Sequence, residues 1–196
     1  MAEPAHLVEQ DDGRMRDMGR EATVEDLYRV PGKAELVNGE LVVMTPGGGT
    51  HGNAAGRIYA SLLAYSDRVG TGVALTDNVG FLVNLPNRRS FCPDAAFWTG
   101  GPLTEKFLEG APVFAVEVRS PEQYGPSAER ELAQKRADYF AAGTLVVWDV
   151  DLRAGCINVY RAARPSTPDV YRRGEVADAE PAVPGWSMPV DDLFPR

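Results

Sequence analysis

Residues 113–119 combine apolar and charged positions in the pattern of a buried strand. Successive side chains of a strand point to opposite faces of its sheet. The even-numbered apolar side chains therefore share one face, and the other is formed by Val113, Ala115, Glu117 and Arg119. The pattern predicts a core strand in which two charged side chains interrupt a face that should be buried.

A helical pattern follows over residues 127–142. At 100° per residue, a single arc of about 80° is formed by Ala128, Leu132, Lys135, Tyr139 and Ala142. Lys135 lies near the middle of this arc, so its ammonium should face the core. A buried carboxylate and a buried ammonium each cost several kcal/mol unless they find a partner or a metal ion. We therefore expect such a partner for both Glu117 and Lys135.

The other periodicities predict a mixed α/β fold in which a helix, three strands, a helix and a strand follow one another, with hairpins at both ends. The remaining elements are expected as a short helix capped by Thr23, a hairpin over residues 35–44 that turns at Asn38-Gly39, a helix after the glycine-rich loop 45–52, strands at 73–83, 91–98 and 145–150, and a strand at 156–161. The proline-rich residues 165–189 predict a loose hairpin and an extended tail.

Length and composition indicate one domain. The chain has 196 residues and 44% hydrophobic content, enough to bury a full core. Residues 1–20 are polar, acidic and without period, so we expect them to be disordered and residues 21–196 to form the domain. No apolar run is long enough for a membrane span, and the start of the chain lacks a signal-peptide pattern, which favours a cytoplasmic protein. Cys92 and Cys156 are expected to be buried thiols.

The net charge of −8 argues at first against binding to nucleic acid, because affinity for phosphates comes mostly from Lys and Arg. The acidic excess is confined to the two ends. Residues 1–26 contain eight acidic and three basic side chains, residues 169–196 contain six and three, and residues 27–168 contain 14 of each. Any affinity for DNA should therefore be modest and strongly dependent on salt.

Several polar residues are candidates for a site. Asp94 follows Pro93 at the start of an apolar strand, and Glu35 and Glu40 flank the turn of the hairpin, where they could also be solvated edge charges. The glycine-rich loop 45–52 could hold a phosphate, but it matches neither a Walker loop nor a dinucleotide fingerprint. His51 at the start of the next helix could be a cap, a packing residue or a neighbour of the site.

Taken together, these motifs resemble the Uma2 family, a group of proposed endonucleases, formerly a domain of unknown function, within the PD-(D/E)xK superfamily. The resemblance covers about residues 23–195. The matching segments are 35–41, His51, Pro93-Asp94, 117–121, 135–139, Ala142-Gly143, 148–151, 184–186 and 192–194. Each segment alone is weakly specific, but their order and spacing together are characteristic.

The resemblance implies a restriction-endonuclease-like core and a metal-dependent endonuclease that cleaves DNA. Asp94 and Glu117 would bind Mg²⁺ or Mn²⁺, because hard cations prefer oxygen ligands and Mg²⁺ takes only a few of them from the protein. Lys135 would orient the attacking water or neutralise developing charge, and Glu35 or Glu40 could complete the acidic set. Cleavage of both strands of a duplex with one site per chain would favour a homodimer or a higher homo-oligomer.

One residue departs from the superfamily pattern. Arg119 stands two positions after Glu117, where the wider superfamily has its lysine. By strand parity Arg119 shares a face with Glu117, so it could bind the substrate phosphate or form a salt bridge with Glu117. The second arrangement would weaken metal binding. The alternative function is therefore a catalytically inactive binding or interaction module, whose buried ion pairs only support the core.

Overall fold

The computed structural model describes residues 7–9, 14–17 and 20–195. Within the segment expected to be disordered, it contains two short strands, β1 (Leu7–Glu9) and β2 (Arg14–Asp17), which pair with each other. The rest of residues 1–19 lies outside the described residues. In the described part of the chain, no helix has the length and apolar character that crossing a bilayer would require.

A six-stranded mixed sheet forms the centre of the fold. Its strands, from one edge to the other, are β13 (Arg164–Arg172), β12 (Cys156–Arg161), β11 (Val146–Asp151), β10 (Phe114–Val118), β8 (Ala95–Trp98) and β5 (Val73–Thr76). Strands β10 and β11 are parallel and are joined through helix α3 (Pro126–Ala141), whereas all other neighbours are antiparallel. The predicted strand at 113–119 is therefore central.

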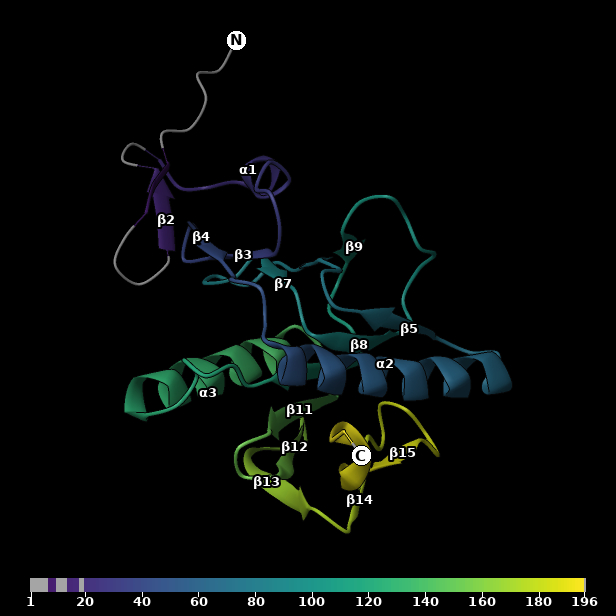
Figure 1. The fold of residues 1–196 in the computed structure, drawn as a ribbon. Coiled ribbons are helices and arrows are strands. Elements are labelled where there is room, and N and C mark those ends of the chain that lie inside the picture. Colours follow the sequence, from purple (N-terminus) through teal and green to yellow (C-terminus); the bar gives the residue numbers. More distant parts are fainter. Residues whose placement is uncertain (1–6, 10–13, 18–19, 196) are drawn as a thin grey trace.

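The alternation predicted for this central strand is confirmed. Phe114, Val116 and Val118 pack in the apolar cluster that contains the inner side of helix α2 (Gly49–Val69). Ala115 belongs to a second cluster, together with Tyr139 of α3. One helix therefore contributes to the core on each face of the sheet. In Figure 1 both helices cross the middle of the molecule, above the C-terminal strands.

An upper part of the molecule is built from short strands. The predicted hairpin is formed by β3 (Ala34–Val37) and β4 (Glu40–Val43), and Asn38 and Gly39 both have positive φ, 52° and 73°, as a type I′ turn requires. A second small sheet contains β6 (Phe81–Leu82), β7 (Ser90–Phe91) and β9 (Leu108–Glu109). The Leu36 amide donates to Ser90 Oγ at 2.8 Å, which fixes β3 against β7.

Three of the predicted strand assignments need correction. Residues 73–83 are divided into β5 and β6, which belong to different sheets. Residues 91–98 do not form one strand, because Pro93 lacks an N–H donor and separates β7 from β8. Residues 165–189 are more regular than expected. Most of their first half lies in the nine-residue edge strand β13, where prolines are tolerated, followed by β14 (Val176–Asp178), β15 (Ser187–Pro189) and a 3₁₀ helix at Val190–Leu193.

The first helix, α1 (Val24–Leu27), begins with the predicted cap. The Asp26 amide donates to Thr23 Oγ1, and the Asp26 carboxylate accepts from the Thr23 amide at 2.9 Å. The hydrogen bond from Arg20 and this capping contact lower the pKa of Asp26. The helix is thus fixed at its start by a reciprocal capping box.

We expect Thr23→Ala to lower the free energy of unfolding by about 1 kcal/mol, because the Asp26 amide loses its acceptor. Urea unfolding followed by circular dichroism measures this change. Thr167→Ala, at an exposed position of β13, is the matched control and should have a smaller effect. Equal losses in the two variants would contradict a capping role.

Candidate active site

Glu117 and Lys135 meet, as the sequence predicts. Strand β10 directs Glu117 toward α3, where Lys135 Nζ lies 2.8 Å from Glu117 Oε2. One helical turn further along, the Tyr139 hydroxyl donates to Glu117 Oε1 at 2.7 Å. The Tyr139 ring is stacked on Phe91 with centroids 3.9 Å apart. Both oxygens of the Glu117 carboxylate are therefore oriented by α3.

Glu35 is the second acid that contacts Lys135. Its Oε1 lies 2.9 Å from Lys135 Nζ and also accepts from the Cys92 amide at 2.9 Å. Its Oε2 accepts from Arg88 Nη1 at 2.5 Å, and Arg88 Nε donates to Asp138 of α3 at 2.9 Å. Lys135 thus lies between a carboxylate of the hairpin and a carboxylate of the central strand.

Asp94 is positioned directly beside Glu117 by the backbone. The Asp94 amide donates to Val116 O at 2.9 Å, and the Asp94 carboxylate accepts from the Val118 amide at 2.8 Å. Those two residues flank Glu117 on β10. Two further groups reach Asp94, Lys33 Nζ at 2.6 Å from Oδ1 and His51 Nε2 at 3.2 Å from Oδ2. Asp94, Glu117 and Lys135 therefore converge at one place.

The three buried acids do not share the same electrostatic environment. Burial favours the neutral form of each, but Lys135 and Arg88 outweigh it at Glu35, and His51 and Lys33 outweigh it at Asp94, so the pKa of both acids is lowered. Burial raises the pKa of Glu117, and the neighbouring Asp94 and Glu35 carboxylates raise it further against the opposing effect of Lys135. Negative charge is therefore compensated least at Glu117.

The Asp94 and Glu117 carboxylates have the oxygen donors that a divalent cation prefers. A carboxylate has about four lone-pair sites, and the protein donors to Asp94 and Glu117 occupy only some of them. The uncompensated charge near Glu117 is what a bound cation would offset. Within residues 20–195, no three His, Cys, Asp or Glu side chains are already arranged as a complete metal site. An ion held by two carboxylates would complete its coordination with water molecules, as is typical of Mg²⁺.

The other candidates fall into two groups. Glu35 and His51 belong to the cluster of polar groups around Asp94, Glu117 and Lys135, where Glu35 forms an ion pair with Lys135 and His51 contacts Asp94. Glu40 stands at the turn end of the hairpin, opposite Val37. Phosphate binding by the glycine-rich loop stays a prediction, and the structure shows a packing contact of this loop. A Cβ at Gly47 would lie 2.6 Å from His51 Nδ1, so the loop packs on the His51 ring. Helix α2 begins inside that loop, at Gly49.

Of the two alternatives for Arg119, the salt bridge with Glu117 is not formed. The Arg119 guanidinium donates to both oxygens of Asp149 on β11, at 2.7 and 2.8 Å, and to both oxygens of Glu129 on α3. Asp149 attracts it because that carboxylate is almost fully buried and needs a charged partner. A contact between Arg119 and a substrate phosphate stays a prediction, which these four hydrogen bonds do not favour.

We expect Arg119→Lys to lower the free energy of unfolding by roughly 1–2 kcal/mol, because an ammonium cannot form two bidentate contacts. Thermal and urea unfolding measure this loss. Arg130→Lys, which changes an exposed arginine of the same helix, should leave the unfolding free energy unchanged within about 0.5 kcal/mol. Equal stability of the two variants would contradict a bridging role of Arg119 between β10, β11 and α3.

Sequence reasoning missed two members of the cluster. Lys33 precedes β3 and stands two positions before Glu35, a spacing that places both side chains on the same side of an extended chain. Tyr139 belongs to the family-matching segment 135–139 and to the inward arc of the helix, but these patterns do not predict its hydrogen bond to Glu117. Both could have been found by asking which polar groups lie on the strand and helix faces that carry Glu35 and Lys135.

Comparison with known proteins identifies the family of the chain and its fold. The model of the Uma2 family, described as "Putative restriction endonuclease", matches residues 24–191. A solved structure described as "a putative nuclease belonging to DUF820 from Anabaena variabilis ATCC 29413" is similar in fold, with a TM-score of 0.72 and 16% sequence identity. The similarity covers 88% of this chain and 97% of that one. No curated protein matches the chain significantly.

The family match extends over most of the chain and includes every residue of the cluster around Glu117 and Lys135. The similar structure has nearly the same length as the matched part of this chain and shares its mixed α/β architecture. This protein therefore belongs to the Uma2 family and has a restriction-endonuclease-like fold.

Proposed function

We propose that this protein is a divalent-cation-dependent endonuclease that hydrolyses phosphodiester bonds of DNA. Asp94 and Glu117 would hold the cation, and Lys135 would assist the attacking water. The single observation that carries the proposal is the position of the Lys135 ammonium, which contacts Glu117 at 2.8 Å and Glu35 at 2.9 Å beside Asp94. The family to which the chain belongs supports a nuclease activity.

When bound, Mg²⁺ or Mn²⁺ would lower the pKa of a coordinated water and stabilise charge on the phosphate. The residues of this chain position the two carboxylates that would hold the ion. Asp94 is fixed by the Val118 amide, and Glu117 is fixed by Tyr139 and Lys135, so each carboxylate is held in a defined position. Such preorganisation is what an active site requires of groups that stabilise charge.

Lys135 would act as a donor and a positive charge. Burial alone would lower the pKa of Lys135, but the Glu117 and Glu35 carboxylates raise it. The side chain therefore stays an ammonium at neutral pH and cannot remove a proton from water. It can orient a water molecule by a hydrogen bond and offset negative charge that develops on the phosphate.

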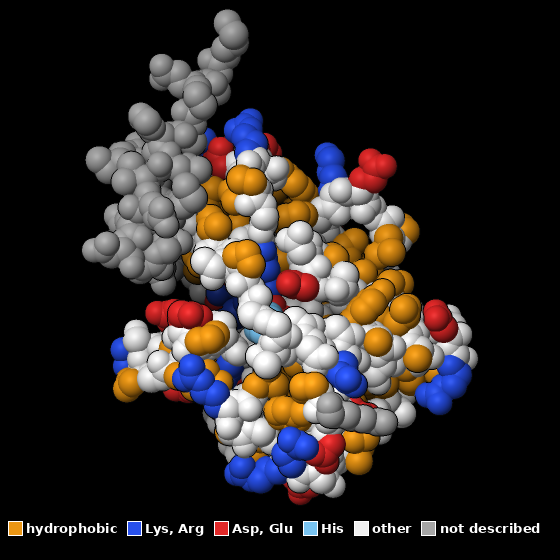
Figure 2. Space-filling model, in the orientation of Figure 1, with side chains coloured by type: hydrophobic (Ala, Val, Ile, Leu, Met, Phe, Trp, Pro, Cys, Tyr) orange, Lys and Arg blue, Asp and Glu red, His pale blue; other side chains and the backbone are white. Residues whose placement is uncertain are grey.

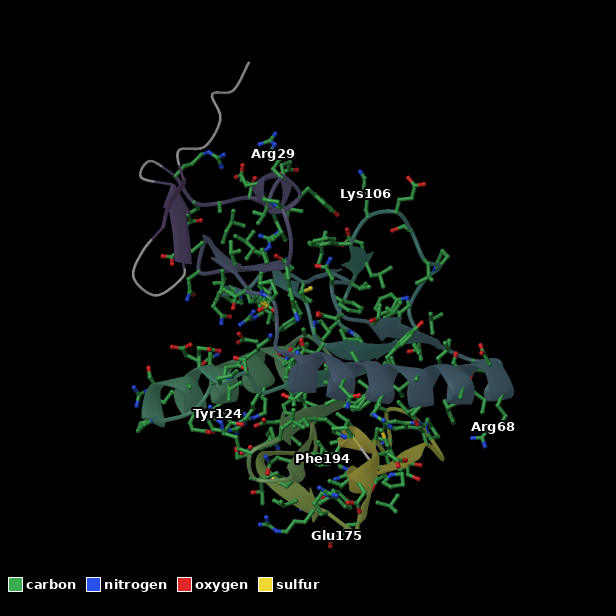
Figure 3. The ribbon with its side chains drawn as sticks, in the orientation of Figure 1. Arg29, Arg68, Lys106, Tyr124, Glu175 and Phe194 are labelled. Carbon is green, nitrogen blue, oxygen red and sulfur yellow. The ribbon has the colours of Figure 1, made fainter. Side chains whose placement is uncertain are left out.

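The charge distribution bears on how DNA would bind. In Figure 3 the labelled cations Arg29, Arg68 and Lys106 lie at the periphery of the molecule, and Figure 2 shows basic and acidic side chains interspersed over the visible face. The described surface thus presents a mixture of charges in this view. We propose a modest affinity for DNA that falls steeply with salt, and a homodimer as the form that cleaves both strands.

A second candidate function is a catalytically inactive binding module. It is favoured by the pairing of the acids, because Lys33, Lys135, Tyr139 and His51 already contact Asp94 or Glu117. A network of paired charges of this kind can support a core without any chemistry. The two candidates differ in one measurable property, which is whether the cluster binds a divalent cation.

Isothermal titration calorimetry with Mg²⁺ and Mn²⁺ tests the proposal, together with cleavage of a plasmid in the presence of each ion or EDTA. We expect wild-type protein to bind the ion and cleave DNA, and Asp94→Ala to lose both properties. No metal-dependent heat and no cleavage by folded wild-type protein would favour the binding module instead.

A further inference from the structure

Lys33 is a second ammonium at the cluster, with two carboxylate partners that differ in their surroundings. Its Nζ lies 2.6 Å from Asp94 Oδ1 and 2.7 Å from Asp77 Oδ1. The Asp94 side chain is 6% exposed, whereas the Asp77 side chain, in the loop after β5, is 46% exposed. Lys33 thus connects the buried acid of the candidate site to an acid in solvent.

The two ion pairs of Lys33 should differ greatly in strength. An ion pair with a solvent-exposed partner contributes about 0–1 kcal/mol, whereas loss of a partner from a buried pair is strongly destabilising. Asp77 Oδ1 is also satisfied by the Asn78 amide at 2.7 Å. Asp77 can therefore release Lys33 at little cost, while Asp94 keeps it in place.

Lys135 has no comparable freedom. Its two carboxylate partners, Glu35 and Glu117, are both largely buried, with side chains 4% and 12% exposed. An ammonium has three N–H donors, and at Lys33 the donor directed to Asp77 is the one that a ligand from solvent can take over. A phosphate oxygen, like the Asp77 carboxylate that it would replace, accepts a charge-assisted hydrogen bond from the ammonium.

From this arrangement we propose that Lys33 binds a DNA phosphate by exchanging Asp77 for a phosphate oxygen, while its contact with Asp94 is kept. This inference rests on the proposed function, because a phosphate held by a cation on Asp94 would lie next to the Lys33 ammonium. Lys33 is then a substrate-binding residue, and Asp77 is an internal competitor that occupies it in the free protein.

The proposal predicts opposite effects for the two partners. Lys33→Met should weaken binding of a fluorescein-labelled DNA duplex about tenfold and reduce the slope of log K against log salt by about one. Asp77→Asn should tighten binding about threefold, because the competing carboxylate is removed. In the Lys33→Met background, Asp77→Asn should tighten binding no more than the loss of an unrelated surface carboxylate does, since the ammonium for which Asp77 competes is absent.

Fluorescence anisotropy measures these affinities with Ca²⁺ in place of Mg²⁺, and a gel checks that the duplex stays intact. Asp67→Asn removes an equal charge from an exposed position of α2 and reports the general electrostatic effect. Lys33→Arg keeps the charge and should retain most of the affinity. The exposed position of Asp77 makes Asp77→Asn informative even if Lys33→Met folds poorly, and circular dichroism checks the fold of each variant.

Weaker or unchanged binding by Asp77→Asn would overturn the proposal, as would tightening equal to that of Asp67→Asn. Tightening beyond that of Asp67→Asn that persists in the Lys33→Met background would also overturn it. These outcomes are distinguishable from failure of the proposed function. If wild-type protein does not bind DNA, or cleaves it independently of Asp94, the endonuclease proposal itself fails. If binding and Asp94-dependent cleavage are present but the two variants do not shift affinity in opposite directions, only the role of Lys33 fails.

Discussion

Asp94→Asn is expected to reduce the rate of metal-dependent DNA cleavage on the order of 10³-fold or more. Asparagine has nearly the same size, and its carbonyl oxygen can still accept from the Val118 amide, which now donates to Asp94 at 2.8 Å. The position of the side chain should therefore be kept. What is lost is the negative charge that would hold a divalent cation beside Glu117.

The loss of activity must be separated from a loss of structure. Lys33 and His51 both contact the Asp94 carboxylate, so the variant should also unfold at a somewhat lower temperature. Cleavage is therefore measured well below the unfolding transition, with excess Mn²⁺, and compared with Asp67→Asn, which should cleave at the wild-type rate. Cleavage by Asp94→Asn within about tenfold of wild type would show that Asp94 is not a ligand of the catalytic ion.

The elements around this site could be predicted because they depend on local patterns. The turn at Asn38-Gly39 follows from two residues that tolerate positive φ. The face of Glu117 follows from the two-residue period of a strand, and the inward position of Lys135 follows from the helical period. Their meeting could be inferred from energetics, since neither charge is tolerated in a core without a partner.

The ion-pair partners of the buried arginines could not be predicted in the same way. Arg119 shares a strand face with Glu117, but it pairs with Asp149 and Glu129, because β11 is parallel to β10 and brings Asp149 alongside. Arg88 and Asp138 are 50 residues apart in the chain. Contacts of this range depend on strand order and register, which the periodicity of a single sequence does not determine.

Helix α3 depends most clearly on such long-range ion pairs. Its apolar contacts are few, since only Leu132 and Tyr139 are its fully buried apolar side chains. It is fixed to the sheet mainly by charged groups, which are Glu129, Lys135, Arg136 and Asp138. A helix held in this way has a weak apolar periodicity in its sequence. The same ion pairs that fix the helix also set the position of the Lys135 ammonium.

Lys135→Met is accordingly expected to affect both stability and catalysis. Removal of the ammonium leaves Glu35 and Glu117 without the cation that they share, and loss of one partner from a buried ion pair typically costs about 3–5 kcal/mol. Arg88 still compensates Glu35, so the loss should be near the lower end of this range. We expect cleavage to fall by about 10²–10⁴-fold, because the water loses its positioned donor.

A second substitution separates the two effects. Glu35→Gln in the Lys135→Met background removes one of the two carboxylates that shared the Lys135 ammonium, so it should recover part of the free energy of unfolding without recovering cleavage. Urea unfolding and plasmid cleavage are measured for wild type, both single variants and the double variant, which together form a double-mutant cycle. If the stabilised double variant regained cleavage, Lys135 would act only through the stability of the fold. If cleavage stayed low while the fold was restored, and Glu35→Gln alone cleaved at the wild-type rate, the ammonium would be required for the reaction itself.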